Sequence, residues 1–159
     1  MPLTTDIVGM HYRYPDYYEV EREKIREYSV AVQNGDAWYT EEGAAAELGY
    51  KGVLAPLTFC CVFGYQAQTA FFKYAHVAVE DAQIVQVDQV LKYFKPLVAG
   101  DRLYCDVYVE SVRVSHGTQI IVTKNIITND DGETIQETYT TLAGRAGDDG
   151  DEGFTDATA

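Results

Sequence analysis

VLAPLTFCCVFGYQAQTAFFKYA, residues 53–75, is the longest nearly uncharged apolar segment of this 159-residue chain. Its bulky and small apolar residues recur at helical spacing, and Pro56 suits the first turn of a helix, where no backbone N–H is needed. Polar residues interrupt the run before it reaches the roughly 18 to 20 apolar residues that a bilayer requires. The segment therefore predicts a buried core helix over residues 56–75, with its bulk on one face: Phe59, Phe63, Ala67 and Ala70.

On the C-terminal side of this helix the hydrophobic period changes from 3.6 to 2, which is typical of strands. Strands are predicted over residues 83–94, 103–112, 118–128 and 133–143, with hairpin turns at SHG, residues 115–117, and NDDG, residues 129–132. On the N-terminal side we expect a short strand at residues 17–20, a helix from residue 21 that ends at Asn34 and Gly35, and a helix over residues 41–48 with Thr40 as its N-cap.

Helices followed by a meander of long antiparallel strands indicate an α+β fold rather than alternating βαβ units. The 56–75 helix is the only element apolar enough to fill one face of such a sheet. We therefore predict a single hot-dog domain over residues 1–146, in which a curved antiparallel sheet wraps around one long apolar helix. Its open edge strands favour side-by-side pairing with a second subunit. The Gly- and Asp-rich segment 147–159 is predicted to be an acidic, disordered tail.

Charge and cysteine content exclude several classes of function. The formal net charge of −13 repels phosphate backbones and anionic lipids, so neither nucleic acid nor a membrane surface is expected as a partner. The three cysteines form no even disulfide framework and have no metal-ligand spacing. Together with an N-terminus that lacks the features of a signal peptide, they predict a cytoplasmic protein without a metal or another cofactor.

Three segments resemble the MaoC-like family of R-specific enoyl hydratases and 3-hydroxyacyl dehydratases. They are YSVAVQNGDAWYTE at residues 28–41, VLAPLTF at 53–59 and FKPLVAGDRL at 94–103. The resemblance covers residues 10–146. A narrower resemblance, to the HadA-type subunits of mycobacterial heterodimeric (3R)-hydroxyacyl-ACP dehydratases, is carried by residues 7–28, 55–59, 83–90 and 136–147.

The resemblance implies a dehydration in which a carboxylate and an imidazole flank the substrate. Asp36 stands at the acid position, but Glu41 stands where the catalytic members have His, which is the side chain suited to proton transfer near neutral pH. The dyad of this chain is therefore degenerate. Each residue also has a structural interpretation, Glu41 as an acid in the first turn of a helix and Asp36 as a loop acid.

The implied function is that of a non-catalytic, acyl-binding subunit, inactive alone, in type II fatty-acid or mycolic-acid elongation. A catalytic hot-dog partner in a heterodimer then removes water from a 3-hydroxyacyl group on acyl carrier protein to give the trans-2-enoyl product. The small and polarizable residues Cys61, Gly64, Tyr65 and Ala67 form what is here termed the soft face of the 56–75 helix. They are the predicted substrate-binding residues, together with two polar residues of the first long strand, Gln86 and Gln89. The histidines, His11, His76 and His116, lie outside the motif and are expected at the surface.

Two other functions remain open from the sequence. One is an acyl-thioester-binding regulatory module without an enzyme partner. The other is a hot-dog thioesterase in which Asp36 activates water.

Overall fold

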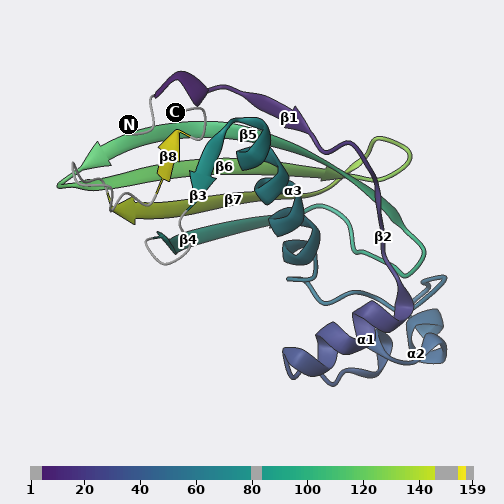
Figure 1. Ribbon diagram of the computed structural model, residues 1–159. Helices are drawn as coiled ribbons and strands as arrows, with labels where there is room; N and C mark the ends of the chain where they lie inside the picture. The colour runs from purple at the N-terminus through teal and green to yellow at the C-terminus, as the bar shows by residue number, and fades with distance from the viewer. Residues whose placement is uncertain (1–4, 80–83, 146–153, 157–159) are drawn as a thin grey trace.

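The computed structural model describes residues 5–79, 84–145 and 154–156 (Figure 1). Its helical elements are η1 Thr5–Ile7, α1 Arg22–Ala31, η2 Ala37–Tyr39, α2 Glu42–Glu47 and α3 Cys60–Tyr74. Its strands are β1 His11–Arg13, β2 Tyr18–Glu19, β3 Val77–Val79, β4 Ile84–Tyr93, β5 Arg102–Ser115, β6 Thr118–Thr128, β7 Thr134–Arg145 and β8 Phe154–Asp156.

One antiparallel sheet in the order β1-β5-β6-β7-β4, with β2 also pairing with β5, curves around α3 (Figure 1). The predicted strands are all present, and β6 has the bounds expected from the sequence. His116 and Gly117 join β5 to β6 with φ values of 50° and 73°, as a two-residue turn of type I′ requires. The α+β hot-dog prediction is therefore confirmed.

The core lies between α3 and β5. Phe59, Phe63 and Phe71 are almost fully buried, and so are the inward residues of β5: Leu103, Cys105, Val107 and Val109. Ala70, which was expected in this core, is only half-buried. The periodicity of the two elements thus predicts most of the core.

The predicted start of the long helix at Pro56 is wrong, because α3 begins at Cys60. The N–H of Ala55 donates to the carbonyl of Leu97 at 2.9 Å, and a bridge between Leu54 and Val98 holds the preceding residues extended. A turn, in which the Phe59 N–H donates to the Pro56 carbonyl, then leads into the helix. Long-range hydrogen bonds that local periodicity does not encode delay the helix start.

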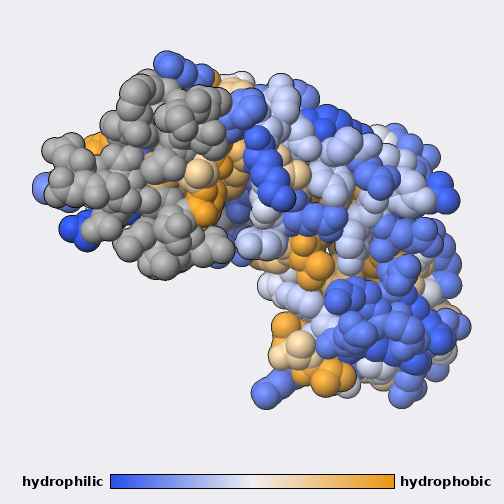
Figure 2. All heavy atoms as spheres, in the orientation of Figure 1, coloured by the Kyte–Doolittle hydropathy of each residue, from blue (hydrophilic) through white to orange (hydrophobic). Residues whose placement is uncertain are grey.

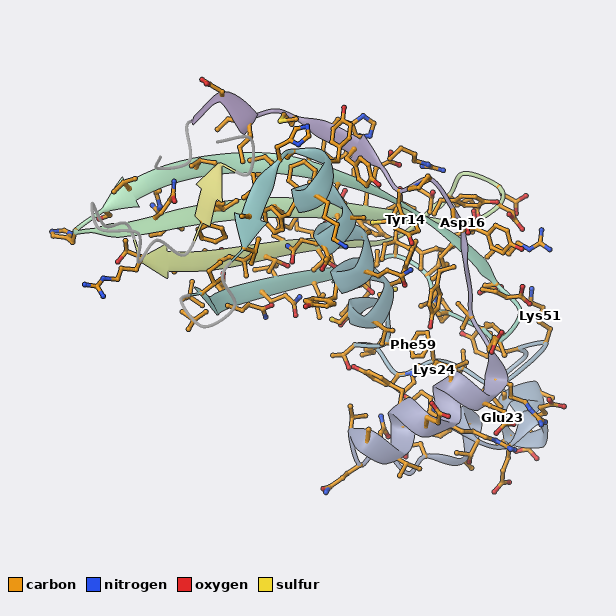
Figure 3. All side chains as sticks on the ribbon, in the orientation of Figure 1. Tyr14, Asp16, Glu23, Lys24, Lys51 and Phe59 are labelled. Carbon is orange, nitrogen blue, oxygen red and sulfur yellow. The ribbon has the colours of Figure 1, made fainter. Side chains whose placement is uncertain are left out.

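The region of α1 and α2 projects from one end of the sheet (Figure 1). Only Ile25 and Ser29 of α1 are buried, and Phe59 lies where the start of α3 meets α1 (Figure 3), with the Tyr28 ring 5.4 Å from it. The N-cap of α2 is Glu41 and not Thr40, whose hydroxyl donates to the carbonyl of Ala37 instead.

The short antiparallel pair β3–β8 was not predicted. Val79 pairs with Phe154, and the Phe154 side chain is completely buried. This corrects the prediction of disorder for Phe154–Asp156, while the rest of segment 147–159 lies outside the described residues. Within the described ranges, no helix combines the length and apolar character needed to cross a bilayer.

Candidate functional site

A cavity of about 260 Å³, here termed the central cavity, lies between the first half of α3 and strands β4, β6 and β7. Five of the six predicted substrate-binding residues come together around it: Cys61, Gly64, Tyr65, Gln86 and Gln89. The sixth, Ala67, is fully buried in the core and does not line this cavity. The five residues come together because β4 lies at the edge of the sheet opposite to β5 and flanks the soft face of α3.

The opposite wall of the central cavity is polar, and sequence reasoning missed it. Asn125 of β6 and Thr138 and Thr140 of β7 line the cavity from the sheet although each is at most 7% exposed. Gln68 of α3 donates to the Thr123 hydroxyl at 2.6 Å, and Gln136 donates to the Thr138 hydroxyl at 3.0 Å. These bonds offset the cost of burying so many polar side chains in one place.

Asn125 of this wall has a buried side-chain oxygen without a hydrogen-bond partner. Its Nδ2 donates to the carbonyl of Gly64 at 3.1 Å, while its Oδ1 is buried and has no partner. The orientation of the amide is fixed by this contact, because a carbonyl can only accept a hydrogen bond. Asn125 therefore offers an unpaired acceptor in a cavity wall.

Gly64 permits this contact by letting α3 approach the sheet closely. A Cβ at this position lies 3.2 Å from Asn125 Nδ2, which is tighter than most Cβ contacts in proteins. The glycine therefore serves both the packing of the helix and the shape of the central cavity.

The thiols beside the cavity are neutral. The Cys61 thiol donates to Gln89 Oε1 at 3.7 Å, and Gln89 Nε2 donates to the Thr140 hydroxyl at 3.4 Å. Burial raises the pKa of Cys61 above its ordinary value, and burial also raises the pKa of Cys60 strongly. Because the thiolate is the nucleophile, these cysteines act here as small, soft wall residues.

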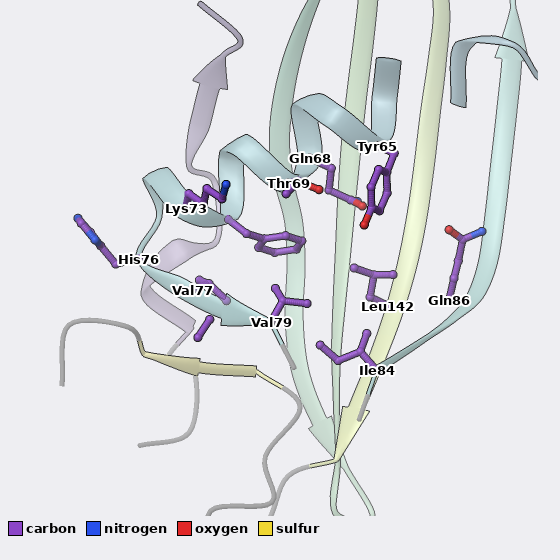
Figure 4. Close-up of a pocket in the computed structure, with 12 residues that line it drawn as sticks. Tyr65, Gln68, Thr69, Lys73, His76, Val77, Val79, Ile84, Gln86 and Leu142 are labelled. Atoms are coloured by element: carbon purple, nitrogen blue, oxygen red, sulfur yellow. The ribbon is translucent and has the colours of Figure 1, made fainter. Parts of the chain in front are cut away.

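A second cavity of about 610 Å³, the distal cavity, continues along the other half of α3. It shares Tyr65, Gln68 and Gln86 with the central cavity. Figure 4 shows its wall formed by α3, by β3 and by side chains of the sheet such as Ile84 and Leu142, while His76 points away from these residues. Away from the shared residues most of the lining is apolar, with Lys73 and His76 also bordering the cavity at the end of α3.

The degenerate dyad lies elsewhere. Asp36 and Glu41 are both exposed, and neither lines the central cavity, the distal cavity or a third cavity of about 100 Å³ that Tyr39 borders. Arg26 of α1 donates to the carbonyl of Thr40 at 2.8 Å and so fixes this segment on the projecting helices. The carboxylates of Asp36 and Glu41 are therefore both open to solvent.

Of the three histidines, His76 borders the distal cavity at the end of α3, while His11 and His116 line none of the three cavities. His11 stacks on Tyr108 at 4.5 Å and bonds to Asp106 at 2.7 Å, whereas His116 sits in the β5–β6 turn. In the described part of the chain no three His, Cys, Asp or Glu side chains gather as metal ligands would.

Strand β4 is the last strand in the order of the sheet, so one of its edges pairs with no other described strand. Strand β4 exposes several apolar side chains. Figure 2 shows further apolar patches in the hollow between the body of the sheet and the projecting helical region. The exposed apolar residues of β4 and its C-terminal neighbour are Val85, Val87, Val90, Tyr93 and Phe94. An unpaired strand edge beside exposed apolar side chains is suited to association with another chain.

Comparisons with known proteins agree with this architecture. The family model of the FAS1-like dehydratase domain region matches residues 6–138. A UPF0336 protein of Mycolicibacterium paratuberculosis is 81% identical over the full length of both chains. A crystal structure of the C-terminally truncated HadBC (3R-hydroxyacyl-ACP dehydratase) complex of Mycobacterium tuberculosis matches with a TM-score of 0.81 and 46% identity, over 89% of this chain and 100% of that one. A MaoC-like dehydratase matches with a TM-score of 0.80 and 36% identity, over 89% of this chain and 43% of that one.

Proposed function

Since this chain belongs to the FAS1-like dehydratase family, we propose that it is the acyl-binding, non-catalytic subunit of a heterodimeric (3R)-hydroxyacyl-ACP dehydratase. In this proposal a second hot-dog chain supplies the catalytic Asp and His. The complex removes water from a 3-hydroxyacyl group on acyl carrier protein in type II fatty-acid or mycolic-acid elongation.

The observation that carries the proposal is the contrast between the central cavity and the dyad positions. The cavity collects Cys61, Gly64 and Tyr65 of α3 against a hydrogen-bonded wall, whereas Asp36 and Glu41 are exposed and outside it. Dehydration of a 3-hydroxyacyl thioester requires a base for the α proton and an acid for the departing hydroxyl, both within reach of one substrate. This chain offers a place for the substrate without that pair.

The acyl chain lies along the soft face of α3 in this model of function. The acyl chain contacts the Gly64 backbone and the Cys61 side chain, which line the central cavity. Each methylene that leaves water contributes about 0.8 kcal/mol to the binding free energy. The free edge and apolar surface of β4 give the partner a place to pair with the sheet. The complex from Mycobacterium tuberculosis, whose matched chain is 46% identical, supports a two-chain arrangement.

The HadA type of subunit is proposed on the degree of similarity. The chain is 81% identical to its UPF0336 relative but 46% identical to the matched chain of the HadBC complex. That gap supports a subunit type distinct from the one in the HadBC structure.

The proposal is tested by comparing the chain alone with a coexpressed pair. The partner is a hot-dog chain from the same organism that carries Gly-Asp and His in the family spacing. We expect no hydration of a trans-2-enoyl thioester by this chain alone and turnover by the pair. Asp36→Asn and Glu41→Gln in this chain leave the turnover of the pair unchanged, while removal of the partner's His abolishes it.

Two results contradict the proposal. Turnover by the isolated chain shows that its own residues are catalytic. Hydrolysis of an acyl thioester that is lost in Asp36→Asn identifies a thioesterase instead.

A further inference from the structure

Strand β3 forms one wall of the distal cavity. Val77, Ala78 and Val79 of β3 line the cavity, and β3 is held in place by its antiparallel pairing with β8. The two strands lie over the concave side of the sheet beyond the end of α3 (Figure 1). A three-residue strand near the C-terminus therefore supports one wall of the largest cavity described in the chain.

Phe154 is the side chain through which β8 supports this wall. It pairs directly with Val79, and side chains of a directly opposed pair lie on the same face of a sheet. Its ring centroid lies 6.3 Å from that of Phe72, which is 5% exposed and also lines the distal cavity. Phe154 itself is fully buried and does not line the cavity, so it acts through Phe72 and Val79.

The distal cavity adjoins the central cavity along one face of α3. The two share Tyr65, Gln68 and Gln86, and the helix between Cys61 and Phe72 spans about 16 Å at 1.5 Å per residue. The lining changes from mostly polar in the central cavity to mostly apolar in the distal cavity, where Phe72, Val77 and Val79 lie; Lys73 and His76, both exposed, also border it at the end of α3. A larger, mostly apolar cavity beside a smaller polar one suits the terminal methylenes of an unbranched acyl chain.

We propose that Phe154 is a positioning residue that sets the maximum acyl-chain length, by holding Phe72 and β3 as the end wall of the distal cavity. This inference rests on the proposed acyl-binding function and adds the segment that limits the chain. It assigns a role in specificity to the C-terminal strand.

The test measures the dissociation constants of straight-chain acyl-pantetheine thioesters of increasing length for the full-length chain in complex with its catalytic partner. In the wild-type complex the affinity rises with length and then stops rising. Phe154→Ala frees space behind Phe72, and we expect the limit to move to longer chains. The affinity gain is about fourfold for each newly buried methylene, with short chains unaffected. Phe154→Leu moves the limit in the same direction by less and retains an apolar side chain in the core.

Val79→Phe is the opposite test, since it adds bulk to the wall without removing Phe154. We expect it to weaken binding of the longest chains and to leave the shortest unchanged. Phe63→Leu is the matched control, because Phe63 is an almost fully buried residue of α3 that packs on Tyr14 and Tyr18 and lines neither cavity. It lowers the melting temperature without moving the length limit.

The outcomes separate the inference from the function on which it rests. A limit that moves with Phe154→Ala or Phe154→Leu, and in the opposite direction with Val79→Phe, supports the inference. If the wild-type complex binds the series but the Phe154 variants weaken all lengths equally or leave the limit in place, Phe154 is only a packing residue and the inference is overturned. If the wild-type complex binds no member of the series, the proposed acyl-binding function itself fails.

Discussion

The concave face of the sheet has two halves that the same helix covers but that differ in chemistry. On β5 the inward residues are apolar and at most 2% exposed: Leu103, Cys105, Val107 and Val109. On β6 and β7 the buried inward residues are mostly polar: Gln119, Thr123, Asn125, Gln136, Thr138 and Thr140. Burial is nearly equal in the two halves, so burial alone does not explain the difference.

The apolar half gains stability from burial without further requirements. The polar half gains stability only if every buried donor and acceptor finds a partner, because an unpaired group costs about 1 to 3 kcal/mol. Most of its groups are paired, such as Gln68 with Thr123, yet Asn125 Oδ1 is not. Under the proposed acyl-binding function, the β5 half maintains the fold, while the β6–β7 half accepts a cost in stability for a binding surface.

The largest expected effect lies in the apolar half. Leu103→Ala removes a fully buried core side chain of β5 and leaves a cavity, and we expect a loss of about 3 kcal/mol in the free energy of unfolding. Denaturant unfolding measures this loss. Val114→Ala on the exposed end of the same strand is the control and changes the free energy by less than about 0.5 kcal/mol. Equal losses in the two variants contradict the assignment of β5 as the stabilising half.

The next largest effect is at Asn125, where Asn125→Asp keeps the shape and removes the amide donor. An ionised carboxylate faces the Gly64 carbonyl without a hydrogen, so we expect a loss of about 2 kcal/mol at neutral pH. Protonation restores a donor, which raises the pKa of the new carboxyl in the folded state above its unfolded value. The deficit is therefore present at neutral pH and shrinks as the pH falls through the folded-state pKa.

Unfolding of this variant and of wild type at a series of pH values measures the deficit. Gln86→Glu, at an exposed position of β4, is the control and shows a much smaller pH dependence. A deficit at position 125 that stays constant with pH disproves the role of the Nδ2 donor.

The apolar half was predictable from the sequence, because in β5 only one face is apolar. Leu103, Cys105 and Val107 alternate with Tyr104, Asp106 and Tyr108, and the structure buries the first set. In α3 the spacing of Phe59 and Phe63 likewise gave the correct face. Strong amphipathic alternation specifies the buried face without tertiary information.

The polar half was not predictable in this way. In β6, Ile and Val occur on both faces, with Ile121 and Ile127 buried but Ile120 and Ile126 only half-buried. The strand therefore does not reveal that Asn125 points inward. The direction of the Asn125 side chain is set by the register in which β6 pairs with β5 and β7.

The C-terminal strand was missed for a related reason. Local composition around Phe154 is Gly- and Asp-rich, which predicts disorder, yet pairing with Val79 and contact with Phe72 order the strand. The lone aromatic residue in an otherwise polar tail was the available signal. Whether this residue is buried depends on its contacts with Val79 and Phe72, which are far away in the sequence.

A smaller effect is expected where the helix meets the polar half. Gly64→Ala gains helix propensity but places a Cβ 3.2 Å from Asn125 Nδ2, which is held in a buried hydrogen bond. We expect a net loss of about 1 kcal/mol, since the helix has to move away and lengthen that bond. Gly43→Ala in α2, where nothing lies within 4 Å of the new Cβ, gains about 0.5 kcal/mol instead. Thermal unfolding of both variants measures these changes, and stabilisation by Gly64→Ala contradicts the close approach of α3 to β6.

The smallest effect is expected for Thr140→Val, and it separates the polar residues that sustain the fold from those that only line the central cavity. Thr140 accepts a long hydrogen bond of 3.4 Å from Gln89, whose side chain is half-exposed and can turn to water, so the loss stays within about 0.5 kcal/mol. Thr138→Val is the matched comparison. It leaves Gln136 Nε2, on a side chain only 2% exposed, without the hydroxyl 3.0 Å away, and costs about 1 to 2 kcal/mol.

Both changes make the cavity wall more apolar by the same group, so denaturant unfolding and acyl-ligand binding on the two variants report different things. If Thr140→Val changes the affinity for an acyl thioester while its unfolding midpoint stays near that of wild type, the hydroxyl at this position belongs to the binding surface. If it destabilises the chain as much as Thr138→Val, the polar half is a structural network throughout, and its contrast with the β5 half is one of composition and not of role.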